Sequence, residues 1–199
     1  MGASILPITI YKGKIIFLFG KERNIDENPG WSDFGGGTDK NEGFIETASR
    51  EGSEEMTGFL GDKNDIKKMM KKYGTYNIDY EGNNGYGIYR CHICPVIYDE
   101  YLTKYYNNNQ RFLQKHLDKK VIRDTKIFEK TEIKWFTFEE IKKNKKKFRN
   151  FYQNIIELIL QNRFEIEKFI RSKKINNLKY KTKKSKSRSN KRITKKSYK

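Results

Sequence analysis

The sequence predicts an α/β (α+β) domain in which a mixed β-sheet carries helices on its faces. Residues 4–11 and 14–20 are rich in Ile, Leu, Phe and Thr, and Lys12-Gly13 between them is typical of a hairpin turn. Residues 21–43 are dense in Gly, Asn, Asp and Pro, so we expect a long loop that leads to a helix starting near Phe44. Together these features favour strands and helices in one layered domain.

The remaining elements follow from local patterns in chain order. We expect a short basic helix over 66–73, strands over 75–80, 86–98 and 132–136, and a helix over 110–117 within a polar insertion at 101–120. Thr137 and Glu140 form the pattern of a capping box at the start of another helix. Apolar residues recur at helical spacing from Phe148 to Phe169, which predicts one long amphipathic helix against the sheet.

The charge is distributed unevenly and divides the chain into two parts. The chain has a net charge of +18, but residues 171–199 hold 14 of its 43 Lys and Arg and no Asp or Glu. Few apolar residues accompany these charges, so the segment cannot bury enough surface to fold alone. We therefore expect a domain at 1–170 and a basic, disordered tail at 171–199, with a polyanionic partner.

The chain is expected to be soluble and intracellular. No stretch approaches the roughly 20 apolar residues of a membrane span, and the N-terminus lacks the pattern of a signal peptide. The only cysteines, Cys91 and Cys94, have no second Cys/His pair to complete a zinc site, so we interpret them as reduced thiols in a strand. The cytoplasm is the expected location, with nuclear targeting by the basic tail as the alternative.

One segment carries a pattern of chemically reactive residues. Gly36 is followed after five residues by Glu42, and after seven more by Arg50-Glu51-Gly52-Ser53-Glu54-Glu55, with Gly58 shortly after. On a helix, the three glutamates share an arc of roughly 100°. They lie beside an apolar stripe formed by Ile45, Ala48, Gly52, Met56 and Phe59.

Three carboxylates on one edge of a helix repel one another. Such like-charge pairs destabilise an isolated helix by a few tenths of a kcal/mol each, roughly, and they raise the carboxyl pKa values unless a cation lies between them. Mg²⁺ or Mn²⁺ accepts carboxylate and carbonyl oxygens and bridges to substrate phosphates. A solvated acidic surface is the simpler interpretation of any isolated Glu-Glu pair, but it does not explain the fixed spacing of the glycines, Glu42 and Arg50.

The segment from Gly36 to Glu55 resembles the Nudix box, and the similarity extends less specifically over residues 4–160. The resemblance implies a Nudix-type mixed sheet flanked by helices and divalent-metal-dependent cleavage of a phosphoanhydride bond. It implies that Glu51, Glu54 and Glu55, with the Gly35 carbonyl, hold the metal. Arg50 would orient a glutamate, and Gly36, Glu42 and Gly58 would support the loop and helix.

Two positions depart from the Nudix pattern. Gly52 replaces a bulky apolar residue, and Gly58 comes one position late. A glycine inside a helix costs about 1 kcal/mol relative to alanine, so we infer that Gly52 packs closely against the sheet.

The general base is expected outside the box. The run from Phe128 to Phe136 is similar to the segment before the late Trp of decapping-type Nudix enzymes, where a glutamate activates water. Spacing to Trp135 favours Glu129, with Glu132 second. A charged residue flanking an edge strand is the alternative interpretation of either glutamate.

The substrate is suggested by the tail and by a further resemblance. The runs from Trp31 to Gly37 and from Phe148 to Tyr152 resemble Nudix hydrolases of large DNA viruses, some of which remove the mRNA cap, and the Lys-, Asn-, Ile- and Tyr-rich composition suits an AT-rich viral genome. We therefore expect capped mRNA as substrate, methylated GDP as product and, for a viral protein, the host cytoplasm as location. The tail cations expected to bind RNA phosphates are Lys173, Lys174, Lys183, Lys184, Arg188, Lys191 and Arg192.

Two other functions remain open from the sequence. One is hydrolysis of another polyanionic phosphate substrate, either a diphosphoinositol polyphosphate or a free nucleotide. The other is a non-catalytic RNA-binding module with a Nudix fold, which the three intact box glutamates argue against.

Overall fold

A computed structural model describes residues 1–23, 29–82, 87–125 and 129–173 of the chain. Its strands are β1 (Gly2–Tyr11), β2 (Lys14–Glu22), β3 (Trp31–Ser32), β4 (Phe34–Gly37), β5 (Tyr76–Glu81), β6 (Ile88–Pro95) and β7 (Lys130–Thr137). Its α-helices are α1 (Phe44–Glu55), α2 (Lys63–Tyr73), α3 (Leu102–His116), α4 (Lys119–Asp124), α5 (Phe138–Lys143), α6 (Tyr152–Gln161) and α7 (Arg163–Ser172), and a 3₁₀ turn, η2, spans Lys145–Lys147.

The strands form one mixed sheet around β1. Strand β1 is parallel to β6 on one edge, whereas its other edge pairs antiparallel with β4 at its start and with β2 at its end. Strand β2 in turn pairs with β3 and β7, and β5 pairs with β6. The predicted hairpin between β1 and β2 is confirmed, and its turn residues Lys12 and Gly13 both adopt positive φ, 48° and 78°.

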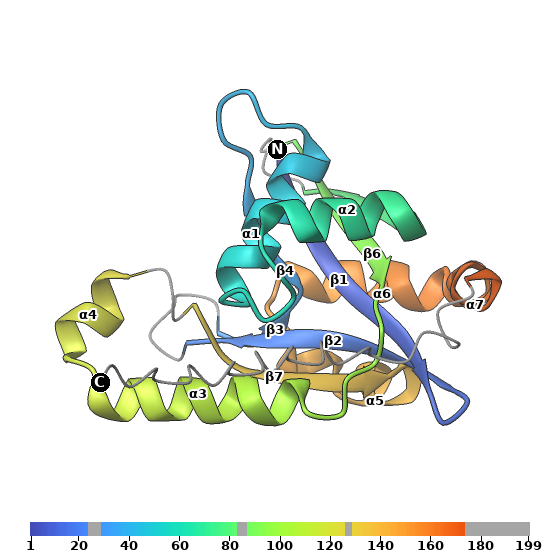
Figure 1. Cartoon of the computed structure of the whole chain (residues 1–199). Helices are drawn as coiled ribbons and strands as arrows, with labels where there is room; N and C mark the ends of the chain where they lie inside the picture. Colours follow the sequence, from blue (N-terminus) through green and yellow to red (C-terminus); the bar gives the residue numbers. More distant parts are fainter. Residues whose placement is uncertain (24–28, 83–86, 126–128, 174–199) are drawn as a thin grey trace, which may run out of the picture.

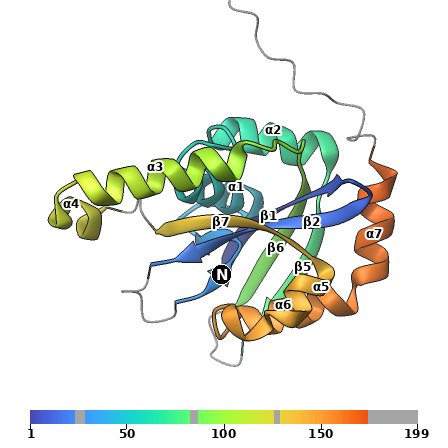
Figure 2. The same ribbon diagram turned by 90° about the horizontal axis from the view of Figure 1, so that it is seen from below.

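Helices cover both faces of the sheet, as Figures 1 and 2 show. One apolar cluster packs α1, α2 and α3 against the face that carries Ile5, Leu18 and Ile133. The other packs α5, α6 and α7 against the face that carries Phe17 and Phe19. The predicted fold class, a mixed sheet between two helical layers, is therefore confirmed.

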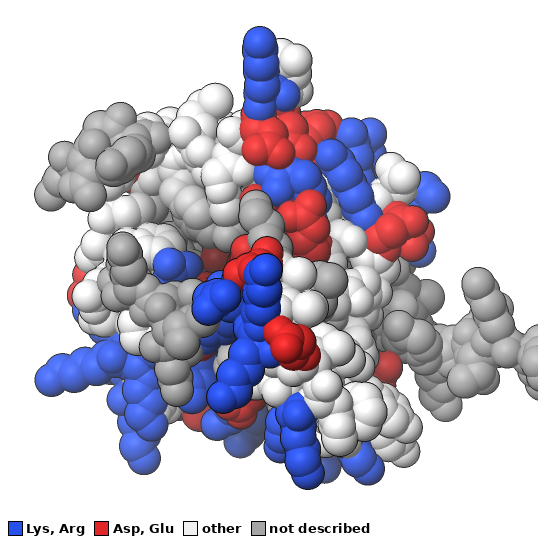
Figure 3. Space-filling view, turned by 90° about the vertical axis from the view of Figure 1, so that its left-hand side faces the viewer, with Lys and Arg blue, Asp and Glu red and all other residues white. Residues whose placement is uncertain are grey.

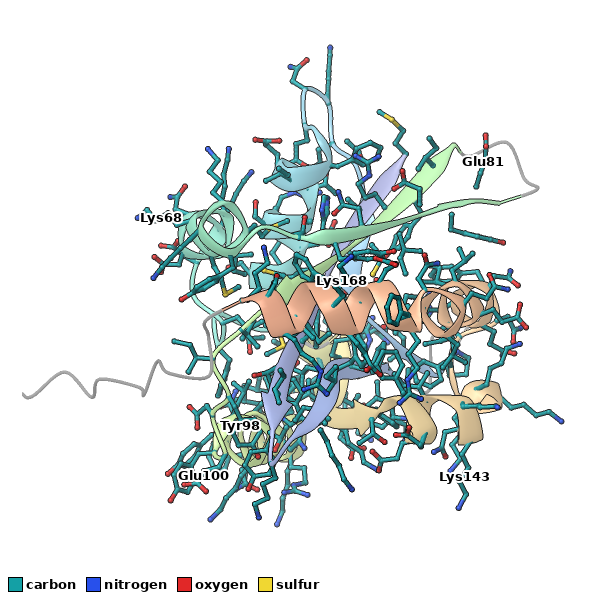
Figure 4. The ribbon with its side chains drawn as sticks, turned by 90° about the vertical axis from the view of Figure 1, so that its right-hand side faces the viewer. Lys68, Glu81, Tyr98, Glu100, Lys143 and Lys168 are labelled. Carbon is teal, nitrogen blue, oxygen red and sulfur yellow. The ribbon has the colours of Figure 1, made fainter. Side chains whose placement is uncertain are left out.

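The long C-terminal helix expected from the sequence is in fact two helices. Helix α6 ends at Asn162, whose side-chain amide donates a 2.9 Å hydrogen bond to the Leu158 carbonyl and whose amide oxygen accepts one from the Tyr76 hydroxyl. Helix α7 then continues in a new direction, and Figure 4 shows it, labelled at Lys168, in front of the strands. The apolar periodicity continues through the bend because both helices bury residues against the same sheet face.

Two local predictions about the helices also have clear outcomes. The capping box at α5 is confirmed, since the Thr137 hydroxyl and the Glu140 side chain each accept a backbone hydrogen bond from the other residue. The insertion forms a longer helix than expected, because α3 begins at Leu102 instead of residue 110. Among the described residues, no helix has both the length and the apolar composition that crossing a bilayer requires.

Candidate active site

Helix α1 brings the box glutamates to the sheet. It packs on β1 through Ala48, Met56 and Gly52, and a Cβ added to Gly52 would lie 2.5 Å from Cγ2 of Ile5. The close packing inferred for Gly52 is therefore confirmed. Ile45 was expected in the same apolar stripe but is 37% exposed, because it lies in the first turn, before the helix meets the sheet.

The glycine run of β4 lies between β1 and the glutamates. Gly35 is opposite Ser4 in the sheet, and a side chain there would collide with Ser4. A Cβ on Gly36 would lie 2.5 Å from Oε1 of Glu51. Glycine is therefore required at position 35, and at position 36 a side chain would displace the Glu51 carboxylate. The Gly35 amide donates a 2.9 Å hydrogen bond to Oε2 of Glu55.

Arg50 connects the loop to the helix. Its guanidinium donates to Glu42 (3.0 Å from Nε to Oε1), to Glu51 (2.7 Å from Nη1) and to the carbonyl of Gly37 (2.9 Å from Nη2), and it lies 3.5 Å from Glu54. Hydrogen bonds from Arg50 lower the pKa of Glu42 to about 2, and those to Glu42 raise the pKa of Arg50 further. Glu42 thus lies against the loop, where it accepts hydrogen bonds from Arg50 and from the Asp39 amide, and Arg50 lies against Glu51.

A turn at the C-terminal end of the motif terminates helix α1. The Gly58 amide donates to the Ser53 carbonyl (2.9 Å), and Gly58 has a φ of 75°, a conformation that favours glycine. Thr57, where the Nudix pattern places the glycine, has a positive φ as well, of 46°.

A buried lysine, which the sequence did not indicate as a site residue, lies beside Glu55. Lys130 is 1% exposed, and its ammonium contacts Glu22, donates to the Ser32 hydroxyl (2.8 Å) and lies 3.4 Å from Oε1 of Glu55. Glu22 also accepts a 2.9 Å hydrogen bond from Nη1 of Arg149. Ion pairs so fully removed from water are uncommon, because desolvation is costly unless every charge is paired.

Gly20 and a β-bulge place Lys130 in this position. The register between β2 and β7 shifts between Lys21 and Glu22, so that Lys130 faces the α1 side of the sheet. A Cβ on Gly20 would be 2.9 Å from the Lys130 stem, so glycine leaves the space that the lysine fills. A glycine in a strand is the one sequence signal that points to such a close approach.

One ammonium faces several carboxylates at this point. Burial raises the pKa of Glu55 well above its ordinary value; the charge of Lys130 opposes this rise, whereas Glu22, Glu129 and Glu51 add to it. Burial also lowers the pKa of Lys130, but the charges of Glu55 and Glu22 outweigh it, so the lysine keeps its proton. The site has a surplus of acid that a further cation would stabilise.

The two candidate bases are placed differently by the bulge. Glu129 precedes β7 and lies near enough to Glu55 to raise its pKa. Glu132 is opposite Lys21 in the sheet register, beyond the bulge. Of the two, Glu129 therefore has an electrostatic influence on a box glutamate, whereas Glu132 is paired by register with β2.

The donor set suits a hard dication such as Mg²⁺ or Mn²⁺. Glu51 and Glu55 are buried next to the glycine strand, and the exposed carboxylate of Glu54 lies 3.5 Å from Arg50. Within the described part of the chain, no three His, Cys, Asp or Glu side chains are already gathered as a metal site. The reason is local, because Arg50 holds Glu51 while Lys130 and the Gly35 amide hold Glu55.

The two cysteines belong to the core. Cys91 packs with α6 on one face of β6 and Cys94 with α1 on the other, so they do not face a common ligand. Burial raises the pKa of both thiols, that of Cys94 to about 12. They are free thiols in strand β6, as the sequence predicts, but they are fully buried where half-buried thiols were expected.

A cavity of about 330 Å³ opens beside the glycine strand. Its wall includes Gly35–Gly37, Asp33, Tyr89, Arg149 and Phe151. The Tyr89 and Phe151 rings meet edge to face with centroids 5.9 Å apart, and the Arg149 guanidinium lies 5.1 Å from the Phe151 ring centre. These rings and the arginine can accept a planar base and a phosphate, respectively.

Asp33 anchors the floor of this cavity. Its carboxylate accepts hydrogen bonds from the Ser4 hydroxyl and from the Tyr89 hydroxyl, the latter 2.8 Å long. Burial raises the pKa of Asp33, and the two hydrogen bonds oppose that rise. Asp33 therefore fixes the Tyr89 ring in place.

Figure 3 shows the side of the molecule that lies at the left in Figure 1, where acidic and basic side chains are interleaved down the middle of the view. Of the cations predicted in the tail, Lys173 is described, and its ammonium lies 4.5 Å from the Phe169 ring centre. The other six predicted tail cations lie outside the described residues.

No protein-family model matches the sequence, and no curated protein matches it. Among solved structures, the chain resembles an Ap4A hydrolase binary complex from C. elegans, with a TM-score of 0.50 and 16% identity over 84% of this chain and 99% of that one. It also resembles the NUDIX domain of Shewanella oneidensis NrtR complexed with ADP ribose (TM-score 0.46, 13% identity, 83% and 86% coverage). A third match is the MutT protein of Methanosarcina mazei Go1 (TM-score 0.43, 15% identity, 84% and 93% coverage). The likeness to the C. elegans enzyme concerns the fold, and the chain has the Nudix fold predicted from its sequence.

Proposed function

We propose that this protein is a divalent-metal-dependent hydrolase that cleaves a phosphoanhydride bond in the 5′ cap of mRNA and releases methylated GDP. The observation that carries the reaction class is the position of the box glutamates on α1: Glu51 and Glu55 contact the glycine strand that borders the cavity, and Glu54 lies beside Arg50. Phosphoanhydride cleavage needs charge neutralisation at the phosphates and an activated water, and this arrangement can provide both.

Glu51, Glu54 and Glu55 would hold Mg²⁺ or Mn²⁺, with the Gly35 carbonyl as a further donor. When bound, the metal would neutralise phosphate charge and lower the pKa of a coordinated water. Arg50 holds Glu51 in place from the side of the loop, as its 2.7 Å hydrogen bond indicates. Lys130 balances the buried negative charge of Glu22 and Glu55.

Glu129 is the proposed general base. It precedes β7 and its charge helps to raise the pKa of Glu55, whereas Glu132 lies opposite Lys21 in the sheet register. A base must reach the attacking water directly or through one other water, and the electrostatic influence of Glu129 on Glu55 favours Glu129 over Glu132. Glu129→Gln should therefore lower kcat far more than Glu132→Gln does, and equal effects would contradict this choice.

The cavity would take the methylated guanosine. A methylguanine carries positive charge on a flat ring, which favours contact with the faces of aromatic side chains such as Tyr89 and Phe151. Arg149 lies between this pair and the buried Glu22, so its remaining N–H groups can bind the phosphate bridge. Capped mRNA is available in the cytoplasm, so this function implies a cytoplasmic protein.

The direct test uses RNA labelled on the cap phosphates, incubated with the purified full chain and Mn²⁺ or Mg²⁺. The expected product is methylated GDP, resolved by thin-layer chromatography, and Glu54→Gln should abolish it. Absence of product from capped RNA with either metal would refute the proposed substrate.

A second candidate substrate is a dinucleoside polyphosphate or another nucleotide. The fold of the C. elegans Ap4A hydrolase favours including it, because that likeness spans 84% of this chain. Ap4A, GTP and a diphosphoinositol polyphosphate belong in the same assay. A higher kcat/KM for one of these than for capped RNA would support the alternative.

A further inference from the structure

The outer face of α3 carries large aromatic side chains that the core does not use. Tyr101 is 49% exposed, Tyr105 58% and Phe112 61%, and all three belong to the polar insertion at 101–120. At 100° per residue they fall within an arc of about 40° on the helix surface. The three rings therefore form one stripe along α3.

Cations follow the same stripe. Lys104, Arg111 and Lys115 lie roughly 40° to 80° to one side of the aromatic line, and all three are exposed. Lys119, Lys120 and Arg123 are exposed on α4, which follows the far end of α3, and residues 101–124 contain only two acids against six Lys and Arg. Glu100, labelled in Figure 4, lies just before α3, and the six cations all follow it in the sequence.

The opposite face of α3 is fixed beside the candidate active site. The Tyr106 hydroxyl donates to the Glu55 carbonyl (2.9 Å) and lies 3.2 Å from that of Lys130. The Asn107 amide exchanges hydrogen bonds of 3.0 and 2.8 Å with the backbone of Ile133 along the outer edge of β7. Arg23 joins α4 to the end of β2 through the Ile122 carbonyl (3.1 Å).

From this arrangement we infer that the outer faces of α3 and α4 bind single-stranded RNA. Aromatic rings beside a row of cations are suited to a chain of bases and phosphates, because the rings stack on the bases and the cations neutralise the backbone. Figure 2 shows the far end of α3 and α4 extending beyond the edge of the sheet, so this surface is open to a long ligand. The inference rests on the proposed function, since the bound RNA would be the body of the transcript whose cap enters the site.

The test measures fluorescence anisotropy of a labelled, uncapped uridine 15-mer with the full chain in EDTA. Tyr105→Ala/Phe112→Ala should weaken binding at least tenfold, about 1.4 kcal/mol, at both 100 and 300 mM salt. Because neither residue is charged, the dependence of affinity on salt should stay the same. Phe164→Ala, which removes a 74% exposed ring from α7, is the matched control and should bind as the wild type does.

Three outcomes would overturn the inference. They are wild-type affinity of the double variant, an equal loss in Phe164→Ala, and binding by the aromatic stripe to anionic phospholipid vesicles in place of RNA. Phe112→Leu keeps the apolar area and removes the ring, so it should lose affinity if stacking is the cause. Because the probe has no cap and no metal is present, failure of cap hydrolysis leaves these results unaffected.

Discussion

Replacing Gly52 with alanine should harm this protein, although alanine is the better helix former. Gly52 lies inside α1 between two proposed metal-binding residues, and its hydrogen faces Ile5 of β1. A new Cβ would lie 2.5 Å from Cγ2 of Ile5 and 3.5 Å from Cδ1 of Ile66. Real Cβ atoms do not approach carbon so closely, so α1 must move away from the sheet or Ile5 must leave its rotamer.

The two effects have comparable size and opposite sign. Alanine in a helix interior gains about 0.5–1 kcal/mol over glycine. Overpacking a dense core costs about 1–3 kcal/mol. The expected net change is a loss of up to about 2 kcal/mol in the free energy of unfolding. Because α1 carries Glu51 and Glu55, its displacement should also weaken Mn²⁺ binding.

Urea unfolding in EDTA measures the stability, and a double-mutant cycle identifies the cause. In an Ile5→Ala background the clash is absent, so Gly52→Ala should there stabilise the chain by about 0.5–1 kcal/mol. A single Gly52→Ala variant that is more stable than wild type and binds Mn²⁺ equally well would refute the close-packing argument.

Three further predictions follow from the same geometry. Lys130→Met should leave Glu55 buried without its lysine counter-ion and Glu22 paired with Arg149 only in place of two cations, and it should destabilise the fold by about 3–5 kcal/mol in urea unfolding, whereas a loss below about 1 kcal/mol would show that the buried ion pairs contribute little. Burial lowers the pKa of His92 to about 4, so the imidazole of the unfolded chain takes up a proton at a higher pH than that of the folded chain. The free energy of unfolding should therefore fall by about 3 kcal/mol as the pH is lowered from about 6.5 to about 4. The fall should be smaller in His92→Gln, and identical pH profiles of the two proteins would contradict a role for His92. Deleting residues 171–199 should weaken RNA binding and flatten its salt dependence while sparing hydrolysis of a small cap analogue, and equal losses on both substrates would refute a separate role for the tail.

The sequence predicted the elements that depend on local pattern. The hairpin turn, the start of α1 and the capping box of α5 were all readable because the turn and cap residues act over two to four positions. The bend at Asn162 was not predictable from the sequence, because asparagine is tolerated within a helix and its hydrogen-bond partner Tyr76 is distant in the sequence. Ile45 was misplaced because helical periodicity does not show where the sheet surface ends.

Within the candidate site, the box residues were predictable and their partners were not. Arg50, Glu42 and the glutamates occur in a fixed register, whereas Lys130 becomes buried only through a bulge and the space left by Gly20. A lysine in a charged segment is ordinarily exposed to solvent, so the local composition did not predict that Lys130 is buried. Arg149 likewise joins Glu22 across more than 120 residues.

The central claim is that the carboxylates of α1 bind a divalent cation that the reaction requires. The most direct measurement is the electron paramagnetic resonance signal of free Mn²⁺ titrated with the full chain, compared among wild type, Glu54→Gln and the control Glu81→Gln. Glu81 is an exposed carboxylate at the end of β5, labelled in Figure 4. We predict that wild type and Glu81→Gln remove Mn²⁺ from solution equally, and that Glu54→Gln binds it at least tenfold more weakly, about 1.4 kcal/mol. Equal Mn²⁺ binding by Glu54→Gln and wild type would contradict the account.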